Sequence, residues 1–191
     1  MSALSRREPL LVVIGPSGAG KSTAIRALAA AGVVEVTPSW TTRPARPDEL
    51  SRCVEHRFVT DGEFDELGRR RFFVATIRPF GLPYRYGLPA VRAPRPDAVA
   101  LLMLRAPHIS VLRRHYDRAV VYQVEDSRER VAARLLERGS VELGSRLRDY
   151  DAEVALGRAT AVRVIVNDRD VVSLVAALRD AISADFGTVA A

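Results

Sequence analysis

The chain of 191 residues is 48% hydrophobic, which suits one α/β domain with a small insertion, and its single cysteine, Cys53, excludes an intramolecular disulfide or a cysteine-based metal cluster. No apolar stretch is long enough to span a bilayer and residues 1–9 lack the apolar region of a signal peptide, so we expect a cytoplasmic protein without a membrane partner. The formal net charge is +6, but the arginines are scattered and no basic stretch carries interleaved aromatic residues, which does not favour a nucleic-acid partner.

In the first half of the chain, apolar runs and capping residues predict short elements around polar loops. Thr60 and Glu63 form a capping pattern that begins a helix. Prolines break any regular element in 39–57, and glycine and proline turns fill 79–96. The predicted elements are a strand at 10–14, a helix at 23–31, a strand at 33–36, a helix from 60 to about 70 and a strand at 72–77.

The second half of the chain alternates strands and helices more regularly. Asp126 with Glu129, and Asp170, are candidate helix caps. The predicted elements are a strand at 98–104, a helix at 106–116, a strand at 119–124, helices at 126–137 and about 142–156, a strand at 162–166 and a helix from 170 to about 184. Such alternation predicts a parallel sheet with helices on both faces.

Residues 15–22 form a complete G-x-x-x-x-G-K-[ST] motif between a predicted strand and a predicted helix. Glycines allow backbone N–H groups to turn inward around phosphates, and a helix N-terminus favours an anion. Lys21, the only lysine in the chain, can reach the β- and γ-phosphates, and the Ser22 hydroxyl can bind Mg²⁺. The motif predicts an ATP-binding site formed by Gly15, Pro16, Ser17, Gly18, Ala19, Gly20, Lys21, Ser22 and Thr23.

A second polar segment, residues 39–49, carries two arginines three positions apart in a proline-stiffened loop. Arg43 and Arg46 can converge on one phosphate, because the planar guanidinium group fits phosphate oxygens in a bidentate way. Ser39 adds a neutral donor. Taken alone, this loop fits a solvated surface equally well. Its position after the phosphate-binding motif predicts a site for the phosphate of an acceptor.

At these residues the chain resembles the guanylate kinase family. The matches are the glycine loop, the segment Thr41–Arg43 with Arg46 and Glu49, a Tyr84–Gly87 segment similar to the family's Y-Y-G, and Val164–Asp168 at the adenine side. The resemblance covers residues 10 to about 182. It implies an α/β P-loop NTPase fold of the nucleoside monophosphate kinase type, with a parallel sheet flanked by helices, a small acceptor-binding insertion and a helical lid.

The resemblance also implies the domain organisation, the activity and the roles of individual residues. The expected single domain, 1–191, has a core at about 10–36 and 98–186, an acceptor-binding segment at about 37–96 and a lid at about 127–157. The expected activity transfers the γ-phosphoryl of ATP, with Mg²⁺ as cofactor, to a small phosphorylated acceptor. The expected catalytic residues are Lys21, Arg134, Arg138 and Arg146, Asn167 is expected near the adenine, and the expected acceptor-binding residues are Ser39, Arg43, Arg46, His56 and Tyr86.

The departures from the family bear on the identity of the acceptor. Val74 lies in the segment where guanylate kinases read guanine with a glutamate, and the segment 101–105, an apolar strand followed by an arginine, replaces two aspartates. A valine cannot accept hydrogen bonds from a base, so these departures argue against a strict guanylate kinase.

Two alternatives to a guanylate kinase stay open. Ribose 1,5-bisphosphate kinases of phosphonate catabolism resemble this chain in the Glu55–His56 pair and the stretch 81–89, which favours a sugar phosphate as acceptor. The other alternative is a catalytically weak guanylate kinase-like module that binds a protein partner.

Overall fold

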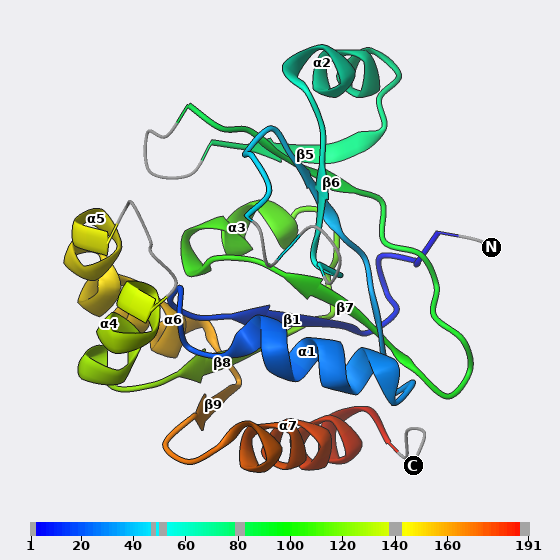
Figure 1. Ribbon diagram of the computed structural model, residues 1–191. Coiled ribbons are helices and arrows are strands. Elements are labelled where there is room, and N and C mark those ends of the chain that lie inside the picture. Colours follow the sequence, from blue (N-terminus) through cyan, green and yellow to red (C-terminus); the bar gives the residue numbers. More distant parts are fainter. Residues whose placement is uncertain (1–2, 47–48, 50–52, 79–82, 138–142, 188–191) are drawn as a thin grey trace.

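The computed structural model describes residues 3–46, 49, 53–78, 83–137 and 143–187. Its centre is a parallel sheet with the strand order β2-β7-β1-β8-β9 (Figure 1). Each neighbouring pair of strands is parallel, so the carboxyl ends of these strands lie at one edge of the sheet. The strands are β2 (Val34–Val36), β7 (Val99–Met103), β1 (Leu10–Ile14), β8 (Ala119–Glu125) and β9 (Arg163–Val166).

Alternate residues of β1 face two separate apolar cores. Leu11 and Val13 pack in the core that contains α1 (Lys21–Ala30) and α7 (Val171–Phe186). The even-numbered residues of β1 pack in a second core with α3 (Ile109–Leu112). Figure 1 shows α1 and α7 on one side of the sheet and α3 on the other. Burial on both faces explains why β1 is a continuous apolar run rather than an alternating one.

A smaller mixed sheet, with the strand order β4-β3-β6-β5, stands above the parallel sheet in Figure 1. Strand β3 pairs with β4 in parallel and with β6 in antiparallel fashion. Its strands are β4 (His56–Phe58), β3 (Ser39–Thr41), β6 (Tyr86–Pro89) and β5 (Phe73–Ile77). The predicted capping box is confirmed: the Thr60 hydroxyl accepts from the Glu63 N–H at 3.2 Å at the start of α2 (Asp61–Arg69).

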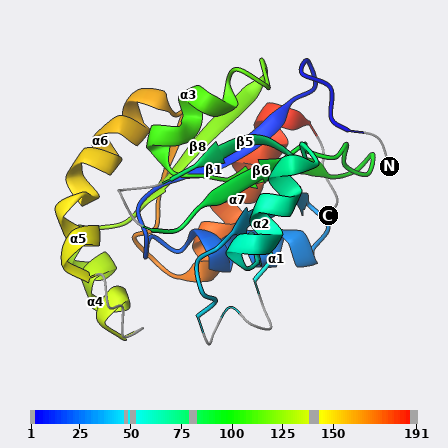
Figure 2. The same cartoon turned by 90° about the horizontal axis from the view of Figure 1, so that it is seen from above.

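Helices α4 (Arg128–Glu137), α5 (Leu143–Arg148) and α6 (Tyr150–Thr160) form the region predicted as a lid. Figure 2 shows them in succession along one side of the molecule. Val131, Leu135 and Tyr150 bury a small core of their own there. The 3₁₀ turn η2 (Ala106–His108) packs against α6, which links this region to the end of β7.

The predicted parallel sheet flanked by helices is confirmed, whereas several element boundaries were wrong. The expected helix at 106–116 is the turn η2 followed by the single turn α3, and the expected helix at 142–156 is divided into α5 and α6. Strand β3 lies in a segment predicted to be irregular, and β6 lies in a segment predicted as loop. Both strands form by pairing with each other across a long sequence separation, which local patterns do not reveal.

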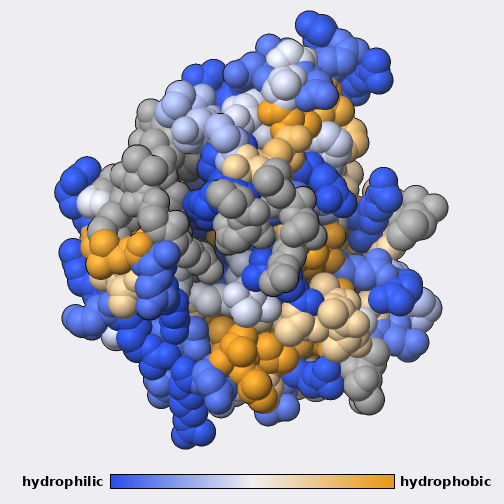
Figure 3. Space-filling view, viewed as in Figure 1, coloured by the Kyte–Doolittle hydropathy of each residue, from blue (hydrophilic) through white to orange (hydrophobic). Residues whose placement is uncertain are grey.

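The surface is mostly polar. On the face shown in Figure 3, apolar atoms emerge in separate small areas and hydrophilic atoms cover most of the remaining coloured surface. Within the described ranges, none of the helices combines the length and the apolar character that crossing a membrane would require.

Candidate active site

The glycine loop turns sharply between β1 and α1 because three of its glycines adopt positive φ angles, which other residues rarely do. The φ angles of Gly15, Gly18 and Gly20 are 135°, 89° and 96°. A Cβ atom at Gly15 would lie 1.9 Å from the carbonyl oxygen of Val124, so no other residue fits against β8 here. The sequence therefore fixes the loop at the carboxyl edge of the parallel sheet.

The N-terminus of α1 faces the site without a capping carboxylate. Its N-cap residue is Gly20, and the first turn contains no acidic residue. The unsatisfied N–H groups of this turn and the helix dipole together favour an anion. The Nζ of Lys21 donates to the carbonyl oxygens of Gly15 at 2.6 Å and Pro16 at 2.8 Å, which holds the ammonium over the loop.

Arg43 and Arg46, predicted to bind an acceptor phosphate, are organised by one buried carboxylate. Glu49 accepts from the Nη2 and Nη1 atoms of Arg43 at 2.8 and 2.9 Å, and from the backbone N–H of Arg46 at 2.8 Å. Burial by itself favours the neutral acid, but the hydrogen bonds from Arg43 and Arg46 hold the pKa of Glu49 below its ordinary value. Glu49 is therefore charged, and it fixes both arginine positions.

Ser39, His56 and Tyr86 surround this pair of arginines. The Oγ of Ser39 and the Nδ1 of His56 are 2.8 Å apart, and the Nε of Arg43 donates to the hydroxyl of Tyr86 at 3.3 Å. Burial is the main cause that lowers the pKa of His56 to about 4, against the opposing effect of the Glu55 charge. His56 is thus a neutral hydrogen-bonding group at neutral pH.

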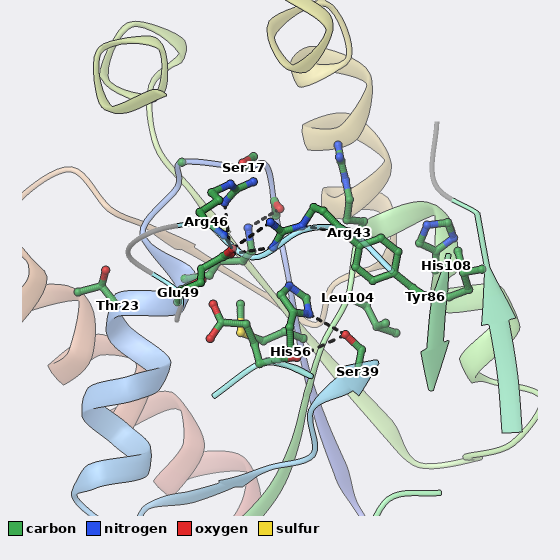
Figure 4. Close-up of a pocket in the computed structure, with 18 of the residues that line it drawn as sticks. Ser17, Thr23, Ser39, Arg43, Arg46, Glu49, His56, Tyr86, Leu104 and His108 are labelled. Carbon is green, nitrogen blue, oxygen red and sulfur yellow. Dashed lines mark hydrogen bonds and ion pairs between the residues drawn. The ribbon is translucent and has the colours of Figure 1, made fainter. Parts of the chain in front are cut away.

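The glycine loop and the residues predicted to bind the acceptor line one pocket of about 200 Å³ (Figure 4). Two sheets supply its walls: the loop follows β1 of the parallel sheet, and the arginine loop follows β3 of the smaller sheet. Figure 4 shows Arg43 between the glycine loop, marked by Ser17, and Tyr86. The predicted residues that the structure brings together in this pocket are Gly15, Ser17, Gly18, Gly20, Lys21, Ser22, Thr23, Ser39, Arg43, Arg46, His56 and Tyr86.

Two other predicted site residues contact the outer side of the glycine loop. The Nδ2 of Asn167 donates to the carbonyl oxygen of Ala19 at 3.0 Å, and it would lie 2.6 Å from a Cβ atom at Gly20. The Nη1 of Arg134 donates to the carbonyl oxygen of Gly18 at 2.9 Å and lies 2.7 Å from Oδ2 of Asp126. Both contacts support the loop. Arg138 lies outside the described residues, and Arg146 lies on α5 with its side chain outside the described part.

Sequence reasoning missed several charged groups around the pocket. Glu55 is buried and lines the pocket. This carboxylate comes from the segment before β4, whereas we looked for one in the segment of Val74, which forms β5. Arg105 lines the pocket and pairs with the buried Glu153 of α6, at 2.9 Å from Nε to Oε1. The buried acid Glu125 ends β8, the buried Asp126, which the sequence suggested only as a helix cap, follows it, and both pair with arginines. Two adjacent acids after an apolar strand were a visible signal in the sequence.

Comparisons with known proteins were made by sequence and by structure. No protein-family model matches the chain. A guanylate kinase from Rubrobacter xylanophilus is 35% identical over 171 residues, an alignment that covers 78% of this chain and 86% of that protein. The chain belongs to the guanylate kinase family.

A second sequence relative and a structural match also support the assignment to the guanylate kinase family. A guanylate kinase from Symbiobacterium thermophilum is 32% identical over 151 residues, covering 67% of this chain and 69% of that protein. The crystal structure of a guanylate kinase from Anaplasma phagocytophilum superimposes with a TM-score of 0.61 at 20% identity, covering 96% of this chain and 88% of that chain. The fold is therefore that of an α/β P-loop kinase, and the chain is an enzyme of this type.

Part of the pocket of this guanylate kinase family member is an apolar wall. Ile77 of β5 and Leu88 of β6 lie on this wall with Met103 and Leu104 from the end of β7. The pocket also has hydrogen-bonding groups, in the Glu55–His56 segment and on the turn after β7.

Proposed function

We propose that the protein transfers the γ-phosphoryl group of ATP to a phosphate oxygen of a small phosphorylated acceptor. The observation that carries the proposal is the shared pocket, whose lining contains both Lys21 of the glycine loop and the arginine pair of the acceptor loop. Phosphoryl transfer needs the donor and acceptor phosphates in line, with their charge neutralised, and little covalent chemistry from the protein. A pocket lined by cations from both the glycine loop and the arginine loop supports this reaction.

The proposed roles follow from position. Lys21 and the backbone N–H groups of residues 17–22 bind the β- and γ-phosphates, where the positive end of α1 adds to the ammonium charge. Arg43 and Arg46, with Ser39, His56 and Tyr86, bind the acceptor phosphate. Arg134, Arg138 and Arg146 belong to the proposed lid, and we assign them the stabilisation of negative charge around the transferred group. Asn167 positions the glycine loop from behind.

Mg²⁺ is the proposed cofactor, and the site fits a metal that arrives with ATP. Ser22 lies in the first turn of α1, directly after Lys21, and would supply one hydroxyl ligand. Among the residues that the structure describes, no group of three or more His, Cys, Asp or Glu side chains could hold a metal ion. Mg²⁺ characteristically keeps several waters and binds through substrate phosphates with few protein ligands, and the Ser22 hydroxyl would be one of these ligands. When bound, it would neutralise phosphate charge.

The acceptor is the open part of the proposal. The curated relatives are named guanylate kinases, which makes GMP the first candidate. The apolar wall formed with Leu104 supports a second candidate, ribose 1,5-bisphosphate, because a sugar phosphate has no base edge to be read there.

The test is ADP release from Mg·ATP with GMP, dGMP, AMP, ribose 1,5-bisphosphate or no acceptor. Lys21→Ala should lower turnover about 100-fold or more, as expected for one lost charge-stabilising group. Arg26→Ala on the next turn of α1 is the matched control and should retain turnover. If the panel is silent while ATP still binds, the proposal fails and the binding module becomes the better interpretation.

A further inference from the structure

The pocket contains a second carboxylate that the proposed roles do not use. Among the described residues that line the pocket, two are acidic, Glu49 and Glu55. Glu49 pairs with Arg43 and Arg46. Glu55 accepts one hydrogen bond, from the N–H of Val54 to its Oε2 at 3.2 Å, and within the described part of the chain it forms no ion pair. Of the two acids, only Glu49 is matched by cations.

Glu55 is an unusual carboxylate because it is buried without a counter-charge. The residue is only 5% exposed. Taking a carboxylate out of water is unfavourable unless a cation or hydrogen bonds replace the lost water. The two oxygens of a carboxylate can accept several hydrogen bonds, and a single backbone N–H satisfies a small part of that capacity. A donor group on a ligand would satisfy more of it.

The second oxygen of Glu55 can be reached from the pocket. Among the described residues, the side-chain polar atoms that have neither solvent access nor a partner belong to His108, Gln123 and Asp126. Oε1 of Glu55 has no partner in this part of the chain and is not one of these atoms, so it keeps access to solvent. Because Glu55 lines the pocket, we take this access to open into the pocket.

Glu55 lies next to the residues proposed to bind the acceptor phosphate. It directly precedes His56, and its carbonyl oxygen accepts from the N–H of Ser39 at 3.0 Å, which ties it to β3. Burial lowers the pKa of His56 to about 4, the charge of Glu55 is the largest opposing influence, and the charge of Arg43 acts on the same ring. A group bound by Glu55 would therefore lie close to the acceptor phosphate.

We propose that Glu55 binds the sugar of the acceptor, with Oε1 accepting a hydrogen bond from a hydroxyl group of the ribose that carries the acceptor phosphate. The inference rests on the proposed function, since it takes the pocket to be an acceptor site. Ribose is common to GMP and ribose 1,5-bisphosphate, so the inference holds for either acceptor. The charge of Glu55 also disfavours a second phosphate at this position, because like charges repel.

The test compares acceptor binding by the wild type and Glu55→Gln, measured by calorimetry without ATP. The probes are ribose 5-phosphate, GMP, ribose 1,5-bisphosphate and inorganic phosphate. Glu55→Gln should weaken binding of ribose 5-phosphate about tenfold, because a charged acceptor forms a stronger hydrogen bond than a neutral amide, and should not weaken binding of inorganic phosphate. Glu55→Asp, which keeps the charge on a shorter side chain, should recover part of the loss.

Thermal denaturation separates a binding role from a structural one. If Glu55 serves the ligand, removing its uncompensated charge should leave the Tm of the ligand-free protein unchanged or raise it. Glu66→Gln is the matched control, because this glutamate is a surface residue of α2 outside the pocket lining, and it should leave every affinity unchanged.

Equal affinities of wild type and Glu55→Gln for ribose 5-phosphate would overturn the inference, as would a lower Tm with an equal loss for every probe. A loss confined to GMP would overturn it too, because the carboxylate would then bind the base. So would wild-type protein that binds ribose 5-phosphate no more tightly than inorganic phosphate. Wild-type protein that binds an acceptor but transfers no phosphoryl group would refute the proposed function alone, because the binding comparison still decides the role of Glu55.

Discussion

Glu49 shows how one buried carboxylate can fix the positions of two arginines. Its carboxylate is 9% exposed and takes the planar fork of Arg43, itself 10% exposed, together with the backbone N–H of Arg46. Arginine side chains lose considerable rotamer entropy when they bind a phosphate. Because Glu49 has already fixed Arg43, part of that entropy is lost before the acceptor arrives.

Glu49→Gln should impair both stability and acceptor binding. The substitution keeps the shape but leaves the buried Arg43 guanidinium without its counter-charge, which should lower the free energy of unfolding by about 3 kcal/mol. It should also raise the acceptor KM about tenfold or more, with little change in the KM for ATP. Urea denaturation and steady-state kinetics measure the two effects.

The contribution of Glu49 to the free energy of unfolding should depend on pH in a definite direction. The folded-state pKa of Glu49 lies below its ordinary value, so its contribution to stability is present above the ordinary pKa and is lost as the pH falls through the folded-state pKa. The stability difference between wild type and Glu49→Gln should therefore shrink in acid. Glu66→Gln, which removes a surface carboxylate paired with arginines on α2, is the control, and an equal rise in acceptor KM there would contradict the prediction.

At the scale of elements, α6 lies against β8 through a glycine that admits no side chain. A Cβ atom at Gly157 would lie 1.4 Å from Oε1 of Gln123, which is fully buried. The Nε2 of Gln123 donates to Oε2 of Glu125 at 2.8 Å and to the carbonyl oxygen of Val154 at 3.0 Å. Gln123 therefore cannot move aside without losing buried hydrogen bonds.

Gly157→Ala should destabilise the protein by about 2 kcal/mol, although alanine is the better helix former, because overpacking outweighs propensity. Gly68→Ala is the matched control. Gly68 is exposed on α2, a Cβ atom there would meet no described atom within 4 Å, and the same substitution should stabilise by up to about 1 kcal/mol. Thermal denaturation of the two variants compares them. Equal shifts of the same sign would show that the α6–β8 contact is looser than described.

The elements predicted correctly are those whose signals are local. The apolar run of β1, the glycine loop and the Thr60–Glu63 capping box are each encoded by adjacent residues, and the structure reproduces them. The arginine loop was found by its local spacing, and the structure places it in the same pocket as the glycine loop. What could not be predicted depends on partners distant in sequence.

Three features illustrate that limit. Strand β6 exists because it pairs with β3 and β5. Glu55 enters the pocket because β4 pairs with β3, and Arg105 is fixed by a glutamate 48 residues away. Periodicity in a single sequence carries no information about such pairings. The residues that line this part of the pocket, and therefore the identity of the acceptor, could not be predicted from the sequence.

At the scale of the molecule, the pocket joins two structural halves, and in the proposed function each half binds one of the two substrates. The parallel sheet presents the glycine loop and Lys21, and the smaller sheet presents Ser39, Tyr86 and the arginine pair. If the halves bind their ligands separately, each ligand should stabilise the fold by its own mass-action term. At 100 times its Kd, a ligand adds about 2.7 kcal/mol. For a chain of this length that corresponds to a rise in Tm of roughly 5–10 °C.

If the halves bind separately, one variant should lose only the Tm rise caused by the nucleotide, and a second variant should lose only the Tm rise caused by the acceptor. Lys21→Ala should lose the Tm rise caused by a non-hydrolysable ATP analogue and keep the rise caused by the acceptor. Arg46→Ala should lose the acceptor response and keep that of the nucleotide, since its side chain is 34% exposed and its removal leaves the Arg43–Glu49 pair in place. Differential scanning fluorimetry of each variant against its own ligand-free Tm measures both responses. Loss of both responses in either variant would mean that the two halves bind only as a unit, because neither cation then acts on one substrate alone.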